Sequence, residues 1–170
     1  MNKLVGKISN ERGRLFNDSV VKCLKQIKEF SVYENVKKIN KKKIEFEKGH
    51  VLGDVDVLII DREKCNIYVA EVKQFNFSRN PYEMHQEYLK MFIDSNQKKC
   101  FVTKHNLRVL WIKEHIEDLI IQYKLETSSW KIIGLFIVDE LLISPKAYNK
   151  SINFISYDDL SLSKIRKIKK

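Results

Sequence analysis

Apolar residues recur along the chain with two different periods, which predict alternating helices and strands. Between Ile8 and Phe30 the apolar positions recur every three or four residues, and this stripe predicts a helix. Val51–Ile60 and Asn66–Lys73 are rich in Val and Ile on both faces, apart from a few charged positions. Strands of that kind are typically central in a sheet and covered by helices.

The rest of the chain continues this alternation. A short strand and a turn at Asn40 follow the first helix, and Pro81 suits the first turn of a later helix. The further predicted elements are strands at Val32–Ile39, Trp130–Val138 and Ile152–Ile155, helices at Pro81–Gln97 and Asn106–Leu125, and a basic helix from Leu160. This order predicts an α/β fold, with a central mixed sheet flanked by helices, in a single domain over residues 1–170.

Composition and charge exclude several classes of protein and favour one kind of partner. The chain has 170 residues and a formal net charge of +10, with 44% hydrophobic residues, which is too apolar for general disorder. No apolar run approaches the roughly 20 residues of a membrane span. The N-terminal residues lack an apolar signal core, and three scattered cysteines without a C-x-x-C predict free thiols, so we expect a cytoplasmic protein. The positive charge favours a polyanionic partner, which charge alone leaves open as nucleic acid or an anionic membrane surface, and an ordinary solvated surface is the alternative. We expect nucleic acid.

A few charged residues interrupt the two apolar strands, and their spacing could bring them together. If the strands form an antiparallel hairpin with residue 60 opposite residue 67, Asp56 lies opposite Glu71, and Asp54 lies opposite Lys73. Directly opposed Cβ atoms are about 4.5–5.5 Å apart. The pairing therefore predicts three carboxylates and one ammonium group in one small patch.

Two interpretations of this patch are open. Buried carboxylates this close repel one another, and a hard divalent cation such as Mg²⁺ or Mn²⁺ would relieve the repulsion. Alternatively, Lys73 neutralises one acid within an ordinary ion-pair cluster. The local pattern alone favours neither interpretation.

Asp56 followed after 14 intervening residues by Glu71-Val72-Lys73 resembles the motif of the PD-(D/E)XK nuclease superfamily, which includes archaeal Holliday junction resolvases and Mrr-type restriction endonucleases. Val55 stands where the motif has Pro. The resemblance covers about residues 8–138 and implies a restriction-endonuclease-like core and a metal-dependent deoxyribonuclease. It implies that Asp56, Glu71 and the backbone carbonyl of Val72 hold Mg²⁺ or Mn²⁺, while Lys73 orients the attacking water.

The first helix departs from the family pattern. Many relatives carry a Phe-Glu pair there, whereas this chain has Phe16 followed by Asn17, which brings no charge. Glu11 and Asp18 are alternatives on the same helix, and Gln86 is a candidate phosphate contact on a later one. The missing Glu favours a second hypothesis, a noncatalytic nucleic-acid-binding or interaction module on the same fold. A glycosidase-like carboxylate pair fits the positive charge and the adjacent lysine poorly.

Basic residues gather in two short stretches. Residues 37–43 and 164–170 each contain five lysines or arginines, too many for a satisfied core. We expect them to contact DNA phosphates, with Lys41, Lys42, Lys43 and Lys167 as the candidates. A homodimer is a further expectation, because cutting both strands of a duplex requires two sites.

Overall fold

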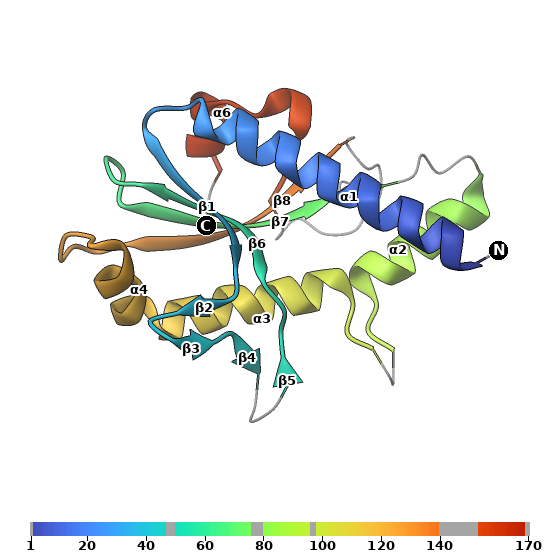
Figure 1. Ribbon diagram of the computed structural model, residues 1–170, viewed down its shortest axis with the longest axis horizontal. Helices are drawn as coiled ribbons and strands as arrows, with labels where there is room; N and C mark the ends of the chain where they lie inside the picture. Colours follow the sequence, from blue (N-terminus) through green and yellow to red (C-terminus); the bar gives the residue numbers. More distant parts are fainter. Residues whose placement is uncertain (1, 47–49, 76–79, 96–97, 140–152, 169–170) are drawn as a thin grey trace.

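A five-stranded mixed sheet forms the centre of the computed structural model, which describes residues 2–46, 50–75, 80–95, 98–139 and 153–168 (Figure 1). Neighbouring strands pair antiparallel in the first half of the sheet and parallel in the second. In spatial order the strands are β1 (Phe30–Val36), β6 (Val55–Asp61), β7 (Asn66–Lys73), β8 (Lys131–Val138) and β9 (Phe154–Ser156). The predicted α/β class with a mixed sheet is confirmed.

Helices cover both faces of the sheet. In Figure 1, α1 (Asn2–Lys25) and α6 (Leu162–Arg166) lie on one side, and α3 (Phe101–Glu114) and α4 (Ile116–Tyr123) lie on the other. A single-turn 3₁₀ helix, η1 (Tyr157–Asp159), precedes α6. Each face has its own apolar core, one packed under α1 and α6 and one under α3 and α4. Within the described ranges, no helix is long and apolar enough to cross a bilayer.

The β6–β7 hairpin has the predicted register. Ile60 pairs with Ile67, and the pairing extends from Asp61 and Asn66 at the turn to Val57 and Ala70. Since a slip of one residue would turn every side chain to the other face, this register decides which charged residues meet.

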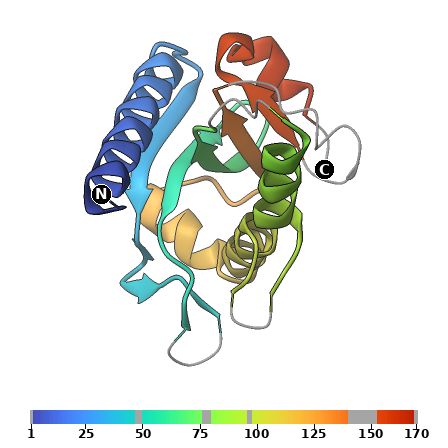
Figure 2. The same ribbon diagram turned by 90° about the vertical axis from the view of Figure 1, so that its right-hand side faces the viewer.

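Several element boundaries differ from the prediction. The predicted helix 106–125 is two helices: α3 starts at Phe101, where the Cys100 sulfur accepts the Thr103 N–H, and it ends at His115, whose backbone is not helical. The second strand begins at Val55, because Gly53 adopts a φ of +84° just before it. The helix from Pro81 is α2 (Pro81–Phe92), which packs beside α3 (Figure 2).

Two pairs of short strands lie between β1 and β6 in the chain, and the first pair contacts α4. Residues predicted as the end of one strand form β2 (Lys38–Ile39), which pairs with β3 (Lys42–Lys43) across a two-residue turn. Asn40 and Lys41 in that turn have positive φ, as the favoured two-residue hairpin turn requires. A second small pair joins β4 (Glu45–Phe46) and β5 (His50–Val51).

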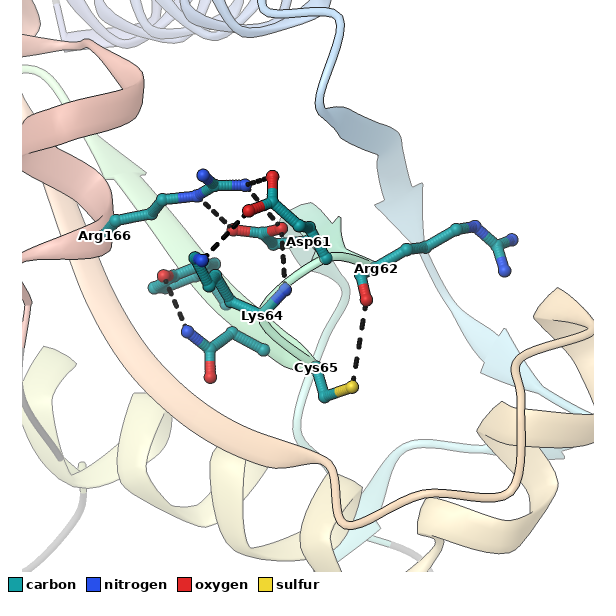
Figure 3. Close-up of polar contacts among 8 residues, drawn as sticks. Asp61, Arg62, Lys64, Cys65 and Arg166 are labelled. Carbon is teal, nitrogen blue, oxygen red and sulfur yellow. Dashed lines mark hydrogen bonds and ion pairs between the residues drawn. The ribbon is translucent and has the colours of Figure 1, made fainter.

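An ion pair between α6 and the end of β6 holds the C-terminal helix on the sheet. Figure 3 shows Arg166 reaching Asp61, which is fully buried at the end of β6. Arg166 Nε lies 2.7 Å from Asp61 Oδ2, and its Nη2 lies 3.0 Å from Asp61 Oδ1 and 2.9 Å from Glu63 Oε2. Three acceptor oxygens therefore fix one guanidinium, whose pKa they raise further.

This contact engages part of the terminal basic stretch within the protein itself. Arg166 is committed to Asp61, and Lys164 lies 3.4 Å from Asp159. Lys167 is exposed, and its DNA contact stays a prediction. Lys169 and Lys170 lie outside the described residues.

Candidate functional site

The hairpin brings Asp56 and Glu71 together where β6 and β7 begin to separate. Asp56 lies one residue beyond the last paired position of β6. There its Oδ2 accepts the backbone N–H of Val72 at 2.8 Å. This bond fixes the Asp56 carboxylate beside the Glu71-Val72-Lys73 segment, as the predicted pairing requires.

Glu71 is 4% exposed and has a cation on each carboxylate oxygen. Lys73 Nζ lies 2.9 Å from Glu71 Oε1, and Arg108 Nη1 binds Oε2. Arg108 comes from α3 and is itself 9% exposed. Its Nε donates to the backbone carbonyl of Leu52 at 2.9 Å, so the guanidinium links the hairpin to the chain segment before β6.

The two acids differ in protonation because they differ in partners. Burial and the nearby Glu71 raise the pKa of Asp56 from 3.8 to about 6, although Lys73 and Arg108 partly oppose this. Burial also opposes the charge of Glu71, but Lys73 and Arg108 outweigh burial and lower the pKa of Glu71. Glu71 is therefore the carboxylate that the fold keeps charged, and Asp56 is the one that it leaves undercompensated.

Sequence analysis missed Arg108 and His105, which precedes it by one helical turn on α3. Burial lowers the pKa of His105 to about 4, so the ring is neutral at pH 7. The ring packs edge-on against Phe136, with centroids 4.6 Å apart, and its Nε2 has no hydrogen-bond partner within the described part of the chain. A charged residue inside an apolar helical stripe was the signal for Arg108, since buried cations need a partner.

Gly134 in β8 allows α3 to lie this close to the sheet. A Cβ atom at Gly134 would lie 3.0 Å from Val109 Cγ2 and 3.1 Å from His105 Nε2. Both distances are shorter than the 3.4–4 Å of ordinary van der Waals contact. A glycine within a strand often marks such a close approach, and here it seats the helix that carries Arg108.

Asp54 does not complete the predicted cluster. Asp54 follows Gly53 in a segment before β6, which starts at Val55, so the strand does not hold it opposite Lys73. Among the residues that the structure describes, no three His, Cys, Asp or Glu side chains form a potential metal-binding group. The prediction of three converging carboxylates is therefore wrong, and two converge.

The remaining predicted site residues lie on other elements. Glu11 and Asp18 are exposed on α1, which packs against the core opposite α3. Asn17 is partly buried there, and its Oδ1 has no hydrogen-bond partner in the described ranges. Gln86 is partly buried on α2. Roles for these four residues in metal or phosphate binding stay predictions.

Three oxygen donors of the kind that divalent cations prefer come together at the site, although two of them belong to the already paired Glu71 carboxylate and its neighbour. Carboxylate and carbonyl oxygens are the ligands that Mg²⁺ and Mn²⁺ prefer, and Asp56, Glu71 and the Val72 carbonyl are the candidates. The raised pKa of Asp56 shows that its negative charge lacks full compensation in this buried position. A cation beside Asp56 would supply that compensation.

The raised pKa of Asp56 predicts a pH-dependent stability. The folded protein holds this proton more tightly than the unfolded chain, so the free energy of unfolding should fall as pH rises from about 4 to about 6. In Asp56→Asn, which mimics the neutral acid, this loss should be absent. The variant should match the wild type near pH 4 and exceed it by on the order of 2 kcal/mol at pH 7.

Denaturant unfolding of both proteins between pH 4 and 7, in EDTA, measures this difference. Groups that do not interact with Asp56 titrate alike in both proteins and cancel in the comparison. A stability difference that does not change with pH would show that Asp56 ionises normally.

The basic hairpin β2–β3 is braced against α4. Lys42 Nζ lies 2.6 Å from Asp118 Oδ2, and Asn40 Nδ2 donates to Asp118 Oδ1 at 2.7 Å. Lys38 and Lys43 pair across the hairpin and are both exposed. Because side chains alternate along a strand, these two lysines project from the face opposite to Lys42.

No family model matches this chain, and neither the curated proteins nor the solved structures include a significant match to it.

Proposed function

We propose that this protein is a metal-dependent nuclease that hydrolyses phosphodiester bonds in DNA. The observation that carries the proposal is the β6–β7 register, which places Asp56 against Val72 and beside Glu71. The ammonium group of Lys73, two residues after Glu71, forms an ion pair with the Glu71 carboxylate. This arrangement is what the resemblance to the PD-(D/E)XK superfamily requires of a site, and the mixed sheet is compatible with a restriction-endonuclease-like core.

The chemistry needs more than side-chain acid–base catalysis. Phosphodiester hydrolysis is so slow that enzymes accelerate it by about 10¹⁷-fold, whereas a positioned acid or base supplies about 10²–10⁴-fold. A bound Mg²⁺ or Mn²⁺ would polarise the phosphate and acidify a water molecule. In that site Asp56 and Glu71 would be the carboxylate ligands. Lys73 would place its ammonium beside the water and the developing phosphate charge.

A second candidate function is noncatalytic binding of nucleic acid on the same fold. The specific observation in its favour is that Glu71 already has both oxygens paired, with Lys73 and with Arg108. Such a cluster is electrically satisfied without a metal ion. Asn17, in place of the glutamate of many relatives, favours the same candidate.

Cleavage assays separate the two candidates. Supercoiled plasmid, linear duplex and single-stranded DNA should each be incubated with the protein in Mg²⁺, in Mn²⁺ and in EDTA. The nuclease proposal expects cleavage of at least one substrate that depends on the divalent ion. Binding of these DNAs without cleavage under any condition would instead support the noncatalytic module.

The hairpin geometry predicts which lysines contact DNA. Changing Lys38 and Lys43 together to Ala should weaken binding to every duplex alike, because phosphate contacts carry no sequence information. Each phosphate contact contributes a slope of about −0.9 to the dependence of log K on log salt concentration. The double variant should therefore flatten that slope by about 2. Fluorescence anisotropy with one labelled duplex over 50–200 mM salt measures it.

Lys42→Ala is the matched control, since it removes one charge from the same hairpin. The Lys42 side chain is 55% exposed, but its ammonium is paired with Asp118, so the slope should change less than in the double variant. Equal slopes for all three proteins would mean that the hairpin is not part of the DNA-binding surface.

A further inference from the structure

Arg108 is placed as an internal counter-ion of the candidate site. It reaches Glu71 from α3, while Lys73 reaches the same carboxylate from the strand. The Arg108 side chain is 10% exposed and that of Lys73 is 29% exposed. The more deeply buried cation is thus the one that sequence analysis did not identify.

The backbone before β6 holds the guanidinium in place. Arg108 Nε donates to the Leu52 carbonyl, and its Nη2 lies 3.5 Å from where a Cβ atom on Gly53 would be. Guanidinium groups are planar and present several donors in a fixed arrangement, so one arginine can serve Glu71 and Leu52 together. A lysine at position 108 would keep the charge, but its donors would all lie on one nitrogen and not in the planar arrangement that spans Glu71 and Leu52.

The formal charges of the four side chains around the site cancel. Asp56 and Glu71 carry up to two negative charges, and Lys73 and Arg108 carry two positive charges. A divalent cation entering this neutral group gains little from its net charge. It must also share the Glu71 carboxylate with Arg108, which already binds Oε2.

We propose that Arg108 competes with the divalent cation for Glu71 and thereby sets the metal affinity of the site. Arg108 is then a positioning residue that keeps Glu71 charged and oriented, and it yields Oε2 to the metal. The inference rests on the metal site of the proposed function, but it does not depend on DNA cleavage.

Removing the charge of Arg108 should strengthen metal binding. Arg108→Gln keeps an amide donor for Leu52 or Glu71 and leaves the site with a net negative charge. Charge interactions at a few ångströms remain significant even at the effective dielectric of a protein surface. We expect Mn²⁺ to bind about tenfold more tightly to Arg108→Gln than to the wild type. Calorimetric titration with Mn²⁺, without DNA, measures this affinity, and circular dichroism verifies that each variant is folded.

Two further variants make the result specific. Arg108→Lys retains the charge, so its Mn²⁺ affinity should stay within about twofold of the wild type. Arg108→Gln combined with Glu71→Gln should lose the gain, because the contested carboxylate is absent. Arg108→Met repeats the charge removal if Arg108→Gln does not fold.

The outcomes separate this inference from the proposed function. Unchanged or weaker Mn²⁺ binding in both neutral variants overturns the competition, whether or not the wild type cleaves DNA. A gain of the same size in Arg108→Lys also overturns it, since packing would then be the cause. A gain confined to the neutral variants supports the inference even if no DNA is cleaved, and in that case only the nuclease proposal fails.

Discussion

Asp56→Asn is expected to eliminate divalent-ion-dependent cleavage while the protein stays folded. The amide oxygen can still accept the Val72 N–H, which the carboxylate accepts at 2.8 Å, so the local structure should persist. The proposed metal site, however, would lose one of its two carboxylate ligands. A catalytic metal contributes several kcal/mol of transition-state stabilisation, and the rate should therefore fall by on the order of 10³-fold or more. Initial rates on the substrate found for the wild type measure the loss.

Asp54→Asn is the control for this prediction, because Asp54 lies two residues away, before the start of β6, whereas Asp56 lies within β6 and accepts the Val72 N–H. Its cleavage rate should remain close to that of the wild type. Cleavage at the wild-type rate by Asp56→Asn would remove Asp56 from the site and would falsify the nuclease mechanism. Equal losses in both variants would restore the original prediction that Asp54 belongs to the cluster.

Arg166→Met is expected to give the largest loss of stability, about 3–5 kcal/mol in the free energy of unfolding. Asp61 is fully buried at the end of β6, and both of its oxygens are paired with Arg166. Without the guanidinium, a buried carboxylate remains with no ionic partner at that end of the strand. Chemical denaturation at pH 7 measures the loss.

Two comparisons isolate the cause. Lys167→Met changes the next residue, which is exposed, and should alter stability by less than about 0.5 kcal/mol. Asp61→Asn combined with Arg166→Met removes the uncompensated charge, so it should recover part of the loss. If the double variant is no more stable than Arg166→Met, the cost comes from lost packing of the arginine side chain and not from the stranded charge.

The parts of the site that were predictable are those fixed by local geometry. Strand alternation and the length of one short turn determine that Asp56 meets Glu71, and both are visible in the sequence. The same holds for the β2–β3 turn, where Asn40 tolerates a positive φ better than most residues.

The parts that were missed depend on contacts between distant segments. Arg108 lies 37 residues from Glu71, and Arg166 lies 105 residues from Asp61. Nothing in the spacing of such residues specifies their partners, because long side chains reach whichever carboxylate the packing of helices on the sheet places below them. The break at His115 is of the same kind, since no Gly or Pro marks it.

Gly134, which has no side chain, allows the helix that carries Arg108 to lie close to the sheet. Gly134 leaves room for His105 and Val109 against β8, so the helix rests at a depth from which Arg108 meets Glu71. An added methyl group there would force the Val109 and His105 side chains to shift by a few tenths of an ångström, although Gly134 lies on another strand from both acids. The surroundings of Arg108 on α3 therefore depend on a residue of β8 that makes no contact with either acid in the ion-pair cluster.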